Sequence, residues 1–129
     1  MNAVVFNPGF RLSILDIGVL MVGSLGAWFL RAVEVDLSYM LIFVVGHFFY
    51  FCNIVRMSRM PELIWASCFV VIIGFGVSNT VVSLTQSFLI SFAITIILTI
   101  LELRKPSYHG VLWSKVNPDL KEWFESKRT

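Results

Sequence analysis

A short polar series inside an otherwise apolar stretch holds most of the residues that could carry chemistry. The series repeats every three residues and consists of His47, Tyr50, Asn53, Arg56 and Arg59. Residues three apart on a helix are neighbours, so adjacent members of the series can touch. The histidine could relay protons, contact a quinone or bind a metal. We favour a hydrogen bond from His47 to a neighbouring helix, because the only other histidine is His109 and one histidine makes a poor metal site.

Asp16, inside the first apolar run, is the clearest candidate for a proton or cation site. An ionisable residue within a membrane span is costly and is a candidate functional residue by default. It follows Arg11 by five residues, which is about 7.5 Å along a helix. The competing interpretation is a structural ion pair with Arg56 or Arg59. We favour the pair, because two arginines compete for one carboxylate.

Two further polar patterns have structural explanations. Glu62 follows Pro61 at the start of an apolar run, where the helix dipole favours a carboxylate, so we expect it to cap a helix. A small hydroxyl residue recurs every four positions at Ser83, Ser87, Ser91, Thr95 and Thr99. This spacing permits close helix packing, for which Gly23 and Ala27 offer a matching surface, and each hydroxyl can bond the carbonyl four residues earlier. A pore lining is the alternative, but no charge accompanies the pattern.

Apolar helices must position these residues, because the composition is that of a membrane protein. The chain has 129 residues, of which 57% are hydrophobic and 14% are charged. Soluble domains carry about 25% charged residues. About 20 apolar residues cross a bilayer as a helix, and residues 63–101 are uncharged over almost twice that length, so this run must fold back. The turn signals near its middle are Gly74, Gly76, Ser78, Asn79 and Thr80.

We therefore predict an all-α integral membrane protein with a four-helix transmembrane domain in residues 1–103. The four transmembrane helices are expected at about residues 12–32, 37–57, 61–78 and 81–103. Four spans place both termini on one side, together with nine of the ten lysines and arginines, and only Arg31 falls on the other side. Basic residues are enriched in cytoplasmic loops. We expect a multi-pass protein of the cell (inner or plasma) membrane, with both termini cytoplasmic.

Residues 104–129 are predicted to form a cytoplasmic tail at the membrane surface, because Pro106 ends the fourth helix. Asn117 and Pro118 are suited to start a short helix. One face of that helix carries Leu120, Trp123 and Phe124. This pattern predicts an amphipathic helix lying on the membrane, although a docking surface for a soluble partner has the same pattern.

The sequence contains no nucleotide-binding loop, zinc-ligand spacing or nucleophile motif, and its net charge of +2 gives no indication of nucleic acid. We predict no cofactor, no metal and no catalytic residues, and we favour a protein that is not an enzyme.

The expected partners are the lipid bilayer and other transmembrane helices, in a hetero-complex or a homo-oligomer. The favoured function is a small accessory or interaction subunit of a larger membrane complex. The alternatives are a small oligomeric proton-coupled transporter or channel using Asp16, and a membrane enzyme or quinone or lipid site around His47, Tyr50 and Asn53.

Overall fold

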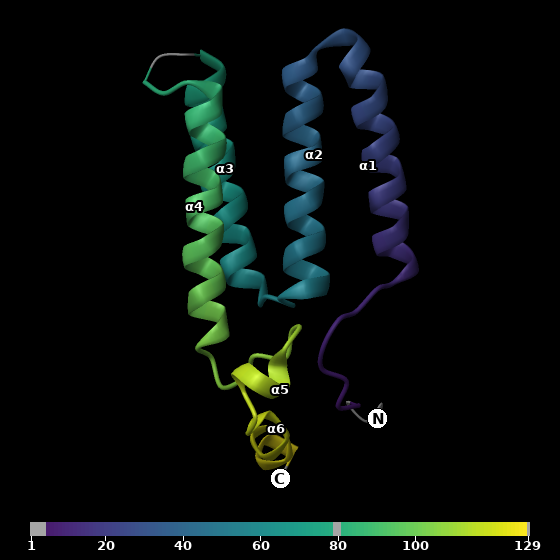
Figure 1. The fold of residues 1–129 in the computed structure, drawn as a ribbon, viewed down its shortest axis with the longest axis vertical. Helices are drawn as coiled ribbons and strands as arrows, with labels where there is room; N and C mark the ends of the chain where they lie inside the picture. The colour runs from purple at the N-terminus through teal and green to yellow at the C-terminus, as the bar shows by residue number, and fades with distance from the viewer. Residues whose placement is uncertain (1–4, 79–80, 129) are drawn as a thin grey trace. The chain divides into compact units, whose positions relative to one another are not determined.

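The computed structural model of the protein describes residues 5–78 and 81–128, and these residues form helices and no strand (Figure 1). The long helices are α1 (Ile14–Val33), α2 (Val35–Phe49) with its π-helical continuation η1 (Tyr50–Ile54), α3 (Arg59–Ser78) and α4 (Leu84–Leu103). Each of the four, counting α2 with η1, has 20 residues and is apolar enough to cross a membrane. The predicted all-helical class and the four long helices are confirmed. Asn79 and Thr80, expected in the turn, lie outside the described residues.

The chain divides into two compact units. The first unit comprises Met1–Arg56 and His109–Leu112. The second unit comprises Met57–Tyr108 and Trp113–Thr129. The second unit therefore also holds the two short helices α5 (Trp113–Val116) and α6 (Leu120–Arg128).

In the first unit, α1 and α2 pack as an antiparallel pair joined by the single residue Glu34 (Figure 1). The pair can approach closely because α1 presents glycine to α2. A Cβ atom on Gly23 would lie only 2.7 Å from Cγ2 of Val45. Near the connection, the buried Ser38 hydroxyl donates a hydrogen bond of 2.8 Å to the Ala27 carbonyl oxygen.

In the second unit, α4 packs its small hydroxyl residues against α3. Ser87, Ser91 and Thr95 are buried, and each hydroxyl donates to the carbonyl oxygen four residues earlier at 2.8–3.0 Å, as the spacing predicts. Opposite them, a Cβ atom on Gly76 would overlap Ser87. The expectation that Gly23 and Ala27 face this hydroxyl row is wrong, because these two residues lie against α2 in the first unit.

Much of the apolar surface of the four long helices stays exposed within the chain. Of the most apolar 18-residue stretch of α1, only 6% is buried within the chain. The buried share of the corresponding stretch is 17% in α2 with η1, in α3 and in α4. Large side chains such as Val22, Trp28 and Phe29 on α1 are more than two-thirds exposed. Exposed apolar patches of this extent are rare on soluble monomers, and four such helices are compatible with a multi-pass membrane protein.

Candidate functional site

Asp16 forms part of a capping box at the start of α1. Its main-chain N–H donates to Ser13 Oγ at 3.2 Å. In return, the Ser13 main-chain N–H and hydroxyl donate to Asp16 Oδ2 at 2.7 and 2.6 Å. A serine and an acid three residues apart satisfy each other's groups in this way at helix N-termini, where the helix dipole also favours a negative charge. The carboxylate thus has a clear structural role in starting α1.

Asn53 connects this cap to the π-helical turn η1. Its side-chain nitrogen donates to Asp16 Oδ2 at 2.9 Å and to the Arg11 carbonyl oxygen at 2.5 Å. The Asn53 carbonyl oxygen accepts the Arg11 N–H at 3.2 Å. Two acceptors facing one amide group require its nitrogen on that side, which fixes the orientation of the side chain. Asn53 is fully buried, and its Oδ1 has no hydrogen-bond partner among the described residues.

Arg56 does not pair with Asp16, so the favoured ion pair is wrong for this arginine. Its guanidinium donates instead to the carbonyl oxygens of Asn7 at 2.5 Å and Gly9 at 3.5 Å. Asp16 needs no arginine because uncharged donors already satisfy Oδ2. Burial, and secondarily the nearby charge of Arg11, lowers the pKa of Arg56 from its ordinary value.

Arg59, the other arginine considered for this pair, begins α3 in the second unit and forms no ion pair with any residue in 5–78 or 81–128.

A segment of the tail completes the polar framework of the first unit. The Gly9 N–H donates to the His109 carbonyl oxygen at 2.7 Å, and the Val111 N–H donates to the Ile54 carbonyl oxygen at 2.8 Å. Main-chain hydrogen bonds therefore join the N-terminal segment, η1 and residues 109–112. Two non-glycine residues here have left-handed backbone angles, Arg56 with φ 51° and Leu112 with φ 61°. Such a conformation costs about 1–2 kcal/mol for an L-residue, so tertiary contacts must hold it.

The other members of the polar series do not converge on Asp16. His47 has its Nδ1 atom 2.8 Å from the Phe43 carbonyl oxygen on its own helix. The Tyr50 ring lies 5.7 Å from the Phe51 ring.

Glu62, which is outside this series, lies in the first turn of α3, where the helix dipole favours its charge. Among the described residues, no group of three histidine, cysteine or acidic side chains is arranged to hold a metal ion.

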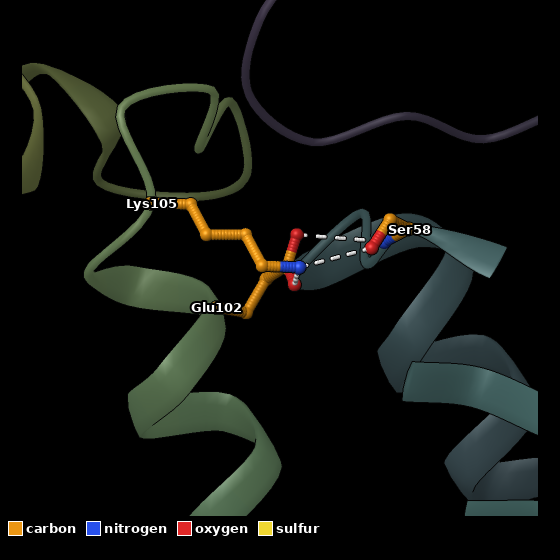
Figure 2. Close-up of polar contacts among 3 residues, drawn as sticks. All are labelled: Ser58, Glu102 and Lys105. Atoms are coloured by element: carbon orange, nitrogen blue, oxygen red, sulfur yellow. Dashed lines mark hydrogen bonds and ion pairs between the residues drawn. The ribbon is translucent and has the colours of Figure 1, made fainter. Parts of the chain in front are cut away.

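Glu102 was not predicted as a site residue, and among the described residues of the second unit it is the buried charged one. Figure 2 shows its contacts at the end of α4. Oε2 lies 2.6 Å from Lys105 Nζ, and Oε1 accepts a long hydrogen bond of 3.4 Å from the Ser58 N–H. Lys105 Nζ also donates to Ser58 Oγ at 3.1 Å. The signal in the sequence was an acid followed three residues later by a base at the end of an uncharged run.

The second residue missed was Trp65, which anchors α3 to the hydroxyl row of α4. Its indole N–H donates to Thr95 Oγ1 at 2.8 Å and, at 3.3 Å, to the Ser91 carbonyl oxygen. The ring is buried and stacks on Phe69, with centroids 5.1 Å apart. No spacing rule in the sequence distinguishes this tryptophan from the exposed Trp28.

These geometries are suited to structural roles. Asp16, Glu102 and the α4 hydroxyls have hydrogen-bond or ion-pair partners inside the chain, and those partners are uncharged donors, carbonyls or a neighbouring lysine. A general base or a cation ligand must also present a lone pair, on oxygen or nitrogen, to its substrate or ion. Comparison with known proteins found no family model, no curated protein and no solved structure that matches this chain.

Proposed function

We propose that this chain is a multi-pass protein of the cell membrane, with both termini in the cytoplasm, that acts as a small accessory or interaction subunit of a larger membrane complex. The observation that carries the proposal is the contrast between its polar and apolar groups. Asp16, His47, Asn53, Trp65 and Glu102 each bond to groups inside the chain, whereas most of the apolar surface of all four long helices is exposed.

Helix α1 is the best candidate for contact with a partner. It buries only Ala27 within the chain. Its exposed surface includes two small residues, Gly18 and Ser24, besides large apolar side chains. Within a membrane, small residues allow the backbones of two helices to approach closely, which lipid contact does not require. This surface therefore supports helix association as well as lipid contact.

Site-specific photo-crosslinking in native membranes tests the subunit proposal. A photoreactive residue at Val22, which is 72% exposed, should give a defined crosslink to another membrane protein. The matched control is Ala27, which is 4% exposed and should give none. Crosslinks from Val22 to lipid alone would contradict the proposal.

The same experiment separates the alternatives. A transporter or channel using Asp16 predicts crosslinks only between copies of this chain, together with pH-coupled flux in liposomes that Asp16→Asn abolishes. An enzyme or a quinone or lipid site around His47, Tyr50 and Asn53 predicts a bound small molecule that copurifies and is lost on substitution of these residues. Neither alternative is favoured by a specific contact of Asp16 or His47, both of which bond to groups of their own unit.

A further inference from the structure

The charges of the α3–α4 pair in the second unit are confined to one end of the pair. Residues 63–101, which contain nearly all of both helices, carry no charge. The contacts of Glu102 and Lys105 with Ser58 place the end of α4 beside the start of α3 (Figure 2). This end carries three cations and two anions, namely Arg59, Arg104, Lys105, Glu62 and Glu102. The charged end is therefore net positive by one.

The three cations differ in what they contact. Lys105 is engaged by the buried Glu102 carboxylate at 2.6 Å. Arg59 and Arg104 are both exposed, and within the part of the chain that the structure describes neither side chain has a hydrogen bond or ion pair. Arg59 follows Ser58 directly in the chain and Arg104 precedes Lys105 directly, so the main chain of each adjoins a residue of the Ser58–Lys105 contact. The ion pair thus leaves two guanidinium groups and the one carboxylate of Glu62 at this end, so the remaining charge is net positive by one.

Each of these arginines lies at the charged end of its helix, on the same side as exposed apolar residues. Ile97, Ile100 and Leu101 lie seven, four and three residues before Arg104 and are 57%, 45% and 54% exposed. Leu63 lies four residues after Arg59 and is 52% exposed. Residues at these spacings share one side of a helix. A cation at the end of an exposed apolar helix surface matches a ligand that has an anionic headgroup and an apolar tail.

We propose that the start of α3 and the end of α4 bind anionic phospholipid, with the headgroup phosphate at Arg59 and Arg104 and the acyl chains along the exposed faces. Guanidinium groups suit phosphate because their planar donors match its oxygens. A free phosphate ion would gain nothing from the apolar faces, and a zwitterionic headgroup carries its own cation. The inference rests on the proposed membrane location and is independent of the subunit role.

Lipid titration of the full-length protein in neutral detergent tests this site. Delipidated protein is titrated with dioleoyl phosphatidylglycerol or dioleoyl phosphatidylcholine, and bound lipid is counted by native mass spectrometry. Phosphatidylglycerol should bind more tightly. A basic residue near an anionic membrane surface contributes about a fivefold change in affinity, so Arg59→Gln combined with Arg104→Gln should weaken phosphatidylglycerol binding about 25-fold. The matched control combines Lys121→Gln with Lys127→Gln, which removes the same charge from α6 and should change binding less than twofold.

Three results would overturn the site: equal affinity for the two lipids, an equal loss in the control pair, or displacement of phosphatidylglycerol by millimolar inorganic phosphate. If the double variant fails to fold, each single variant should still show about a fivefold loss, and a smaller loss in both would reject the site. Carbonate extraction of cell membranes tests the location separately. Release of the protein by carbonate would reject the membrane location itself.

Discussion

The side-chain nitrogen of Asn53 donates a hydrogen bond of 2.9 Å to Oδ2 of Asp16, which lies 37 residues away in the sequence. This contact joins the capping box of α1 to the π-helical turn that ends the second span. Isolated π-helical turns often mark functional positions. In this chain, the turn holds the amide that supports the first helix cap.

Replacing the buried Asn53 by alanine should destabilise the first unit by about 1–3 kcal/mol, because the Arg11 carbonyl and the Asp16 carboxylate each lose a donor. Asn53→Asp should cost more, since it places a second carboxylate beside Asp16. Unfolding in mixed micelles, followed by circular dichroism, measures both effects. An aspartate that is tolerated as well as alanine would show that this contact is not made.

The capping box predicts that Ser13 and Asp16 act as a pair. Ser13→Ala and Asp16→Ala should each lower the free energy of unfolding by about 1 kcal/mol. The double variant should cost clearly less than the two single changes added together, because each residue caps the other. Ser83→Ala, in the corresponding box with Gln86 at the start of α4, is the control for a similar cap elsewhere. Additive losses would separate Asp16 from the cap and restore it as a candidate transport residue.

Gly76→Ala should weaken the packing of α3 on α4, because the added methyl group would overlap Ser87 and lie 3.4 Å from the Leu84 Cα atom. Overpacking of this kind costs about 1–3 kcal/mol. Gly74→Ala, two residues earlier on the same helix, meets nothing within 4 Å and should be neutral or slightly stabilising. Thermal unfolding of the two variants in one detergent makes the comparison. Equal stability would mean that α3 and α4 do not approach at Gly76.

Leu112→Gly should stabilise the first unit relative to Leu112→Ala by about 1 kcal/mol, because glycine adopts the left-handed angle of this residue without a steric penalty. The leucine side chain is 61% exposed, so its removal costs little packing. Both variants lack the side chain, and their difference isolates the backbone strain. The measurement is the free energy of unfolding, and a less stable glycine variant would contradict a left-handed Leu112.

Several features followed from the sequence because they depend on neighbours along the chain. The four long helices were predicted from apolar runs with few charges, whose length and hydropathy are local properties. The hydrogen bonds from the Ser91 and Thr95 hydroxyls to carbonyl oxygens of their own helix were predicted from the spacing of four residues. The Ser13–Asp16 box was also readable as a serine followed three residues later by an acid, although the sequence analysis assigned Asp16 to an ion pair instead.

The partners of these residues were decided only by tertiary structure. Charge counting predicted Arg56 or Arg59 beside Asp16, but Asn53 occupies that place because a buried amide satisfies both the carboxylate and a main-chain carbonyl. The pairing of residues 109–112 with Gly9 and Ile54 has no signal in composition, since it uses main-chain groups that every residue carries. The periodicity of the sequence specifies which residues form a helix and which face of it is apolar. Contacts between distant segments depend instead on how the whole chain folds.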